Sequence, residues 1–129
     1  VLAIDPGNAE AQVTYVLSLT DQFAETMTRG LQRARESVAR IADPYRNAYY
    51  NGIVCERWAK THLRRGQSHS MKTAYEWFDK AMTYYATAEA QRPAGNDEAI
   101  LRWNSCVRVL AEHPQVRPME AEAYEPSLE

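Results

Sequence analysis

The residues of this 129-residue chain that could perform acid–base chemistry are mainly carboxylates, and their spacing gives them a different explanation. Paired Asp or Glu residues transfer protons or bind metal ions when they converge on one point. Here five glutamates each precede a basic residue by four positions, the favoured orientation for an ion pair on a helix surface. The pairs are Glu25 with Arg29, Glu36 with Arg40, Glu56 with Lys60, Glu76 with Lys80, and Glu98 with Arg102. We expect all five to be solvent-exposed surface pairs.

Histidine and cysteine are the other candidates for chemistry. His62, His69 and His113 show none of the spacings typical of zinc ligands, so we expect them at or near helix ends on the surface. Cys55 and Cys106 lie on or beside apolar stripes and form no C-x-x-C pair, which predicts buried, reduced thiols. We therefore predict no enzyme activity, no catalytic residue, no metal site and no cofactor.

The elements that position these residues are predicted to be helices throughout. Apolar residues recur at steps of three and four, and Gly, Pro, Asp and Asn are concentrated at a few points between these stretches. The pattern predicts helices over about residues 9–19, 22–42, 44–65, 70–92 and 97–112. Asn8, Asp21 and Asp43 are the expected N-caps, and Gly66 is the expected left-handed C-cap of the third helix. Residues 1–4 are expected to be the last turn of an earlier helix.

The fourth predicted helix is apolar on two faces. Phe78, Met82 and Tyr85 continue one stripe, and Trp77 and Tyr84 form a second line seven residues apart. A helix with two apolar faces is packed between neighbours, which is typical of a stacked array of helices.

An internal repeat supports the same architecture. The segment Gly-Asn-Ala-Glu-Ala at residues 7–11 recurs as Gly-Asn-Asp-Glu-Ala at residues 95–99, 88 positions later. Two helix pairs of about 44 residues each fit in this interval, a scale typical of helical-hairpin arrays.

Two segments have the spacing of a known repeat family. Residues 74–82 read Ala-Tyr-Glu-Trp-Phe-Asp-Lys-Ala-Met, and residues 2–11 read Leu-Ala-Ile-Asp-Pro-Gly-Asn-Ala-Glu-Ala. The first segment resembles the second helix of a tetratricopeptide repeat, and the second resembles the junction between two such repeats. The resemblance implies antiparallel helix pairs whose first helices line a concave groove that holds another protein. The fourth helix is about two turns longer than in the family. The family's carboxylate-clamp pattern of Lys and Asn is not evident, since the first helix offers Val13 and Leu17 at that face.

We therefore predict an all-α fold in which antiparallel helix pairs stack as a short, tetratricopeptide-like α-solenoid of about five main helices. Residues 1–113 are expected to form the helical domain, as a fragment of an array that is longer at its N-terminus. Residues 114–129 are expected to be an acidic, extended tail, because they hold Glu120, Glu122, Glu125 and Glu129.

A line on the third helix is the candidate binding site. Arg46, Tyr50, Arg57 and Arg64 follow one another at steps of four, seven and seven, so they lie on one helix face. In a tetratricopeptide-like array this face would meet a peptide or an acidic tail. The alternative interpretation is a solvated basic face with no ligand.

Our leading hypothesis for function is a protein-binding scaffold that holds a peptide or a helical segment of a partner, which could be acidic. The first alternative is a self-assembly module whose acidic tail docks on its own or a neighbouring copy. In that case the chain could form a homo-oligomer. Nucleic-acid binding through Arg57, Lys60, Arg64 and Arg65 is a weaker alternative, because the net charge is only −2. No apolar run is long enough to span a membrane, and no signal peptide is visible, so we expect a cytoplasmic protein with no membrane partner.

Overall fold

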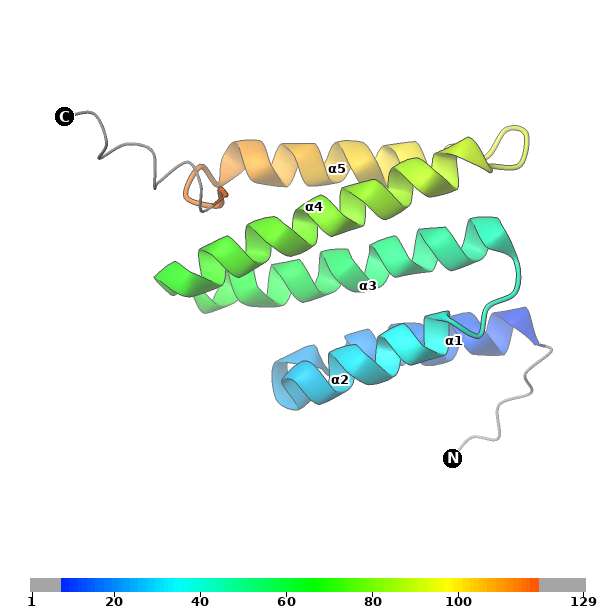
Figure 1. The fold of residues 1–129 in the computed structure, drawn as a ribbon, viewed down its shortest axis with the longest axis horizontal. Helices are drawn as coiled ribbons and strands as arrows, with labels where there is room; N and C mark the ends of the chain where they lie inside the picture. Colours follow the sequence, from blue (N-terminus) through cyan, green and yellow to red (C-terminus); the bar gives the residue numbers. More distant parts are fainter. Residues whose placement is uncertain (1–7, 119–129) are drawn as a thin grey trace.

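The computed structural model describes residues 8–118, and this part of the chain folds into five helices without a strand. They are α1 (Ala9–Thr20), α2 (Phe23–Val38), α3 (Pro44–Arg65), α4 (Ser68–Ala90) and α5 (Glu98–Glu112) (Figure 1). The prediction of an all-α fold with about five main helices is confirmed.

The helices stack in chain order as antiparallel neighbours. α1 pairs with α2, α3 forms the most extensive contact with α4, and α5 packs on α4. Two further contacts, of α2 with α3 and of α1 with α3, join the two hairpins (Figure 1). This arrangement confirms the predicted stack of antiparallel helix pairs.

Most of the predicted helix ends are correct. The Asn8 side chain accepts a hydrogen bond from the Ala11 amide at 2.9 Å, and Asp43 accepts one from the Arg46 amide at 2.8 Å. Gly66 ends α3 with φ of 73°, a left-handed conformation that glycine adopts without steric cost. Asp21 was expected to cap α2, but it is the C-cap of α1, and α2 follows Gln22 without a side-chain cap. The Asp21 carboxylate instead faces α3.

The second helix departs from its predicted form. α2 ends at Val38 rather than near Ala42, and its backbone is interrupted at Met27, where φ is 51° and ψ is −130°. This conformation is uncommon for a residue with a side chain. The regular apolar spacing from residue 23 to residue 41 gives no sign of this break, because the stripe continues on both sides of it.

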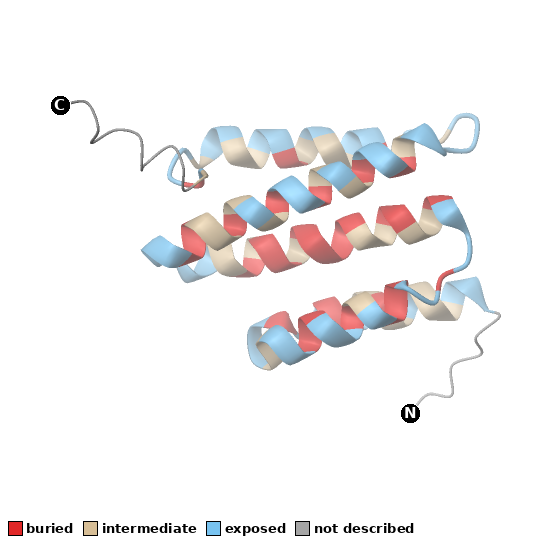
Figure 2. Cartoon of the chain, in the orientation of Figure 1, coloured by how far each residue is buried: buried red, intermediate tan, exposed pale blue. Residues whose placement is uncertain are grey.

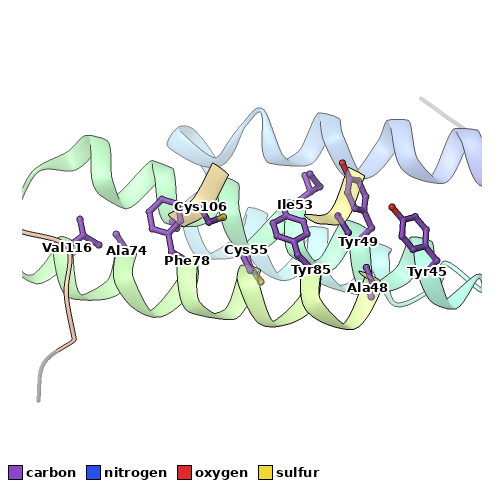
Figure 3. Close-up of a cluster of buried hydrophobic side chains, with 14 of the residues drawn as sticks. Tyr45, Ala48, Tyr49, Ile53, Cys55, Ala74, Phe78, Tyr85, Cys106 and Val116 are labelled. Atoms are coloured by element: carbon purple, nitrogen blue, oxygen red, sulfur yellow. The ribbon is translucent and has the colours of Figure 1, made fainter. Parts of the chain in front are cut away.

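The core consists of two clusters that meet at α3. One cluster lies among α3, α4 and α5 and includes Tyr49, Phe78 and Tyr85 (Figure 3). The other lies among α1, α2 and α3 and includes Val54 and Trp58. Burial therefore extends along most of α3, the central helix of the stack (Figure 2).

The second apolar line of α4 is also packed, as the two-faced pattern predicts. Trp77 is partly buried against both clusters, and the Arg35 guanidinium lies 5.3 Å from the centre of its ring. Arg35 also donates a hydrogen bond to the Tyr84 hydroxyl at 3.1 Å. These contacts connect the last turn of α2 to α4.

A glycine allows α3 and α4 to approach each other closely. A Cβ atom added at Gly52 would lie 2.6 Å from Cδ1 of Tyr85, whose ring is fully buried. Contacts of this length do not occur between carbon atoms, so any larger residue at position 52 must displace the ring or separate the helices.

We expect Gly52→Ala to destabilise the fold by about 1–3 kcal/mol through overpacking, although alanine favours a helix over glycine by about 1 kcal/mol. Urea unfolding followed by circular dichroism measures the change. Asn104→Ala, at an exposed position of α5, is the control and should change the free energy of unfolding by less than about 0.5 kcal/mol. A Gly52→Ala variant as stable as the parent chain would show that α3 and α4 are not held at this distance.

Candidate functional site

Two hollows lie along α1, α3 and α5, alternate helices of the stack, and each is lined by residues from these three helices or their ends. We call them the two sections of one groove. The basic section, about 320 Å³, is lined by Thr20, Asp21, Glu56, Arg57, Lys60, Thr61, Arg64 and Arg102. The tyrosine section, about 680 Å³, is lined by Ala9, Glu10, Asp43, Tyr45, Arg46, Tyr49, Tyr50, Pro93, Asn96 and Glu98.

All four residues of the predicted line face this groove, but they divide between its sections. Arg46 and Tyr50 line the tyrosine section, whereas Arg57 and Arg64 line the basic section. Arg46 and Arg64 are 18 positions apart, which corresponds to about 27 Å along α3. Each section thus holds one pair, and about two helical turns of α3, from Tyr50 to Arg57, separate the two pairs. That these side chains bind a partner stays a prediction.

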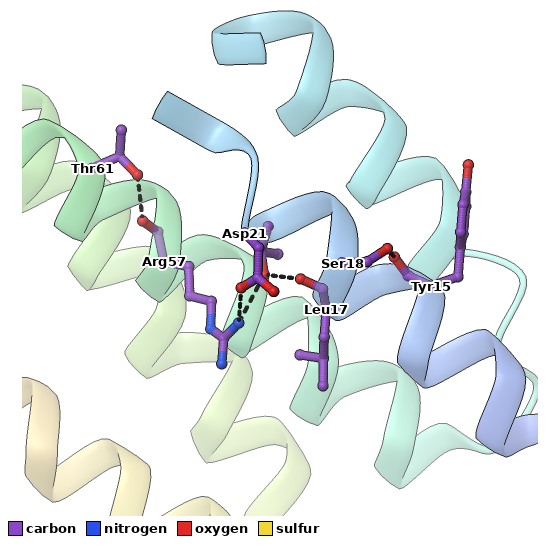
Figure 4. Close-up of polar contacts among 7 residues, drawn as sticks. Tyr15, Leu17, Ser18, Asp21, Arg57 and Thr61 are labelled. Carbon is purple, nitrogen blue, oxygen red and sulfur yellow. Dashed lines mark hydrogen bonds and ion pairs between the residues drawn. The ribbon is translucent and has the colours of Figure 1, made fainter. Parts of the chain in front are cut away.

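Arg57 joins α3 to the end of α1. Its guanidinium donates hydrogen bonds to Thr20 Oγ1 at 2.9 Å and to Asp21 Oδ1 at 3.4 Å (Figure 4). The Asp21 side chain is 74% exposed, so this ion pair contributes at most about 1 kcal/mol. The pair therefore fixes the orientation of Arg57 more than it stabilises the fold.

Glu56 is buried, which corrects its prediction as an exposed surface residue. Its residue exposure is 1%, and its Oε1 accepts a hydrogen bond from the Tyr85 hydroxyl at 2.6 Å. Its Oε2 forms ion pairs with Lys60 Nζ at 2.7 Å and with Arg102 at 3.7 Å. The Tyr85 and Arg102 partners come from α4 and α5, so spacing within α3 could not reveal them.

The other predicted surface pairs are not formed. Among the five acid-before-base pairs, all within the described residues, only Glu56 with Lys60 is within ion-pair distance. Arg102 faces Glu56 across the groove instead of pairing with Glu98, which lines the tyrosine section. The prediction was wrong here because tertiary partners compete with a helical neighbour whose contribution is only a few tenths of a kcal/mol.

The buried carboxylate changes the ionisation of its neighbours. Burial raises the pKa of the Tyr85 hydroxyl, and the charge and hydrogen bond of Glu56 raise it further. Burial lowers the pKa of Arg102, but a hydrogen bond with Tyr49 and the charge of Glu56 outweigh it, and the net shift is upward. Tyr85 thus stays a neutral donor and Arg102 a cation at the base of the groove.

Three tyrosines form the wall of the other section. The rings of Tyr45 and Tyr49 stack with their centres 5.8 Å apart, and Tyr50 meets Tyr49 edge to face at 5.0 Å. The hydroxyls of Tyr45 and Tyr49 point to the same side of α3 (Figure 3). Burial, followed by the charge of Glu98, raises the pKa of Tyr45 to about 12. Tyr45 and Tyr49 are buried, yet they also line the groove.

The remaining candidates for chemistry are the cysteines and the histidines. Cys55 and Cys106 are free and fully buried, as predicted, and burial raises the pKa of their thiols to about 11 and about 12. His62 packs edge to face on Trp58 at 4.7 Å, and burial lowers the pKa of its imidazole. The ring of His113 makes a hydrogen bond to the Val109 carbonyl at 2.9 Å. Over residues 8–118 no group of three or more His, Cys, Asp or Glu side chains is placed to hold a metal ion.

The predicted acidic tail, residues 114–129, is described only as far as Pro118, and its four glutamates lie outside the described residues. Within the described part, Val116 is buried at 4% exposure against the cluster of α3, α4 and α5. The predicted docking of the tail in the groove therefore stays a prediction. In the same described range, no helix combines the length and apolar character needed to cross a membrane.

The two copies of the internal repeat lie at the beginnings of α1 and α5, but their asparagines differ in role. The Asn8 side chain caps α1 and accepts from the Ala11 amide, whereas Asn96 precedes the N-cap Asp97 and accepts a hydrogen bond from the Glu98 amide at 3.0 Å. Comparisons with protein-family models, curated proteins and solved structures give no match for this chain. The tetratricopeptide resemblance therefore stays a prediction, and the interpretation of the groove depends on its own geometry.

We expect Glu56→Gln to destabilise the fold by about 1–3 kcal/mol, because it removes the charge that Lys60 and Arg102 face in a buried position. The matched control is Glu76→Gln, which removes an exposed glutamate of α4 and should have almost no effect. The free energies of unfolding of both variants in urea provide the comparison. Equal stability of the two variants would contradict a structural role for the Glu56 charge.

Both thiols should be protected from Ellman's reagent at about pH 8, because the reactive thiolate is disfavoured by burial in each case. Their pKa values are raised in the folded state, so the stability they contribute is fully present below the unfolded pKa and is lost as pH rises through about 11–12. The expected result is slow labelling of the native chain and rapid labelling of two thiols in concentrated guanidinium. Rapid reaction of either thiol in the native chain would contradict the burial of Cys55 and Cys106.

Proposed function

We propose that this chain is a protein–protein interaction module, and not an enzyme, that holds a segment of a partner protein in the groove of α1, α3 and α5. The observation that carries this proposal is the presence of two hollows, each lined by residues of the same three helices or their ends. Among residues 8–118, by contrast, the His, Cys, Asp and Glu side chains form no group of three or more placed to hold a metal ion, and we identify no convergent set for catalysis.

The dimensions of the groove suit a short segment. The approximately 27 Å from Arg46 to Arg64 corresponds to about eight residues of extended chain at roughly 3.3 Å per residue. A binding groove on the first helices of successive pairs is also what the resemblance to tetratricopeptide repeats implies. These two arguments support a peptide-sized ligand.

The walls of the groove are held in place before a ligand arrives. Arg57 is fixed by Thr20 and Asp21, and Tyr49 is enclosed by aromatic neighbours. Side chains that are already ordered lose less conformational entropy on binding, which favours affinity. A preorganised wall supports a binding function over a merely solvated basic face.

Nucleic acid is a weaker candidate ligand for the same surface. Arg57 and Lys60, two of the four cations predicted for that role, pair with Asp21 and Glu56 of the same chain. These carboxylates would lie beside any phosphate in the basic section and repel it. The pairing therefore favours a protein ligand over a polyanion.

The test is selection of binders from a displayed library of random peptides, followed by NMR chemical-shift mapping of the selected peptides on the labelled chain. We expect shifts at groove residues of α1, α3 and α5, and little change on the outer faces of α2 and α4. As a matched pair, Arg64→Glu should weaken binding, whereas Arg29→Glu, at an exposed position of α2, should not. Failure to select any peptide, or shifts confined to other surfaces, would contradict the proposal.

A further inference from the structure

The two sections of the groove differ in charge. Four cations and two carboxylates line the basic section, whereas three carboxylates and one cation line the tyrosine section. The groove therefore changes sign along α3, from negative near its N-terminal end to positive near its C-terminal end. A ligand that spans both sections meets opposite charges at its two ends.

The positive charges of the basic section are only partly neutralised by ion pairs within the described part of the chain. Arg57 pairs with Asp21, and Lys60 and Arg102 share the single carboxylate of Glu56. Arg64 is exposed and has no ion pair among residues 8–118. Charge is therefore available in this section for an acidic side chain of a ligand.

The negative charge of the tyrosine section is equally available. Glu10 and Glu98 are exposed and form no ion pair within the described part of the chain. Their field reaches the tyrosines: burial raises the pKa of Tyr50, and the charges of Glu98 and Glu10 raise it further, against the opposing effect of Arg46. A cation placed here would meet carboxylates and aromatic rings together, and both attract it.

The direction of the stacked helices explains this segregation. Glu10 lies in the first turn of α1, Asp43 caps α3, and Glu98 lies in the first turn of α5. Acidic residues at these positions lie beside the positive N-terminal ends of the helix dipoles, and Arg64 in the last turn of α3 lies beside a negative C-terminal end. Both placements are favourable. A full charge exceeds the roughly half charge of one helix end, so the side chains determine the sign that a ligand meets.

We propose that the groove selects a partner segment whose charges are segregated end to end, with a basic end over the tyrosine section and an acidic end in the basic section. This inference rests on the proposed function, because it requires that a segment of a protein occupy the groove. It deepens that function by naming the chemistry of the ligand: Lys or Arg at one end, Asp or Glu at the other, and a neutral spacer of about six residues between them.

The test compares synthetic peptides of one composition. One peptide has lysines and glutamates in separate blocks joined by a neutral spacer, and its isomer has the same residues in alternating order. Fluorescence anisotropy at low salt should give the segregated peptide an affinity about tenfold higher, and the difference should shrink as salt screens the charges. Equal affinities for the two isomers would overturn the inference.

Substitutions at each end locate the two blocks. Arg64→Glu should lower the affinity for the segregated peptide about threefold to tenfold. It should not lower the affinity for a version of that peptide whose glutamates are replaced by glutamines. Glu98→Lys should lower the affinity for the segregated peptide by a similar factor. It should not lower the affinity for a version of the peptide whose lysines are replaced by neutral residues. Arg29→Glu and Glu112→Lys, which lie outside the groove lining, are the charge-matched controls and should change neither affinity. An effect of Glu98→Lys equal to that of Glu112→Lys would overturn the assignment of the basic end.

The outcomes separate this inference from the proposed function. If library-selected peptides map to the groove but bind with no preference for segregated charge, the groove is a binding site and only the inference about its ligand fails. If neither the library nor the synthetic peptides shift any groove resonance, the proposed function fails and the inference fails with it.

Discussion

The contact between α3 and α4 at Gly52 and Tyr85 is the constraint on which the rest of the structure depends. Because position 52 has no side chain, the Tyr85 ring lies directly against the backbone of α3. Its hydroxyl then reaches Glu56, one helical turn further along. A buried carboxylate without such a donor would be costly, so the close packing of two helices permits a charged residue within the core.

Glu56 in turn determines the form of the basic section. Its second oxygen holds Lys60 from the same helix and Arg102 from α5, so one carboxylate connects α3, α4 and α5. The cations are consequently fixed at the base of the groove. The aromatic packing of Tyr49 against Tyr85, with ring centres 5.8 Å apart, extends the same core toward the tyrosine section. Both sections therefore depend on one layer of packing between α3 and α4.

Sequence patterns predicted the helices and the face of α3 that lines the groove, because both follow from local periodicity. The spacing of Arg46, Tyr50, Arg57 and Arg64 is a property of a single helix, and the structure preserves it. The patterns could not predict the burial of Glu56, whose partners Tyr85 and Arg102 are 29 and 46 positions away, nor the role of Asp21, which pairs across 36 positions. Side chains brought together from different helices carry no signal in local spacing.

The backbone break at Met27 divides α2 into a first turn and a longer remainder that need not share one axis. Both parts pack toward α3. The Phe23 ring of the first turn meets the Trp58 ring edge to face with centres 5.3 Å apart, and Leu31 and Val38 of the remainder belong to the same buried cluster. The break therefore lets the first turn follow α1 closely while apolar residues on both sides of Met27 contribute to one core.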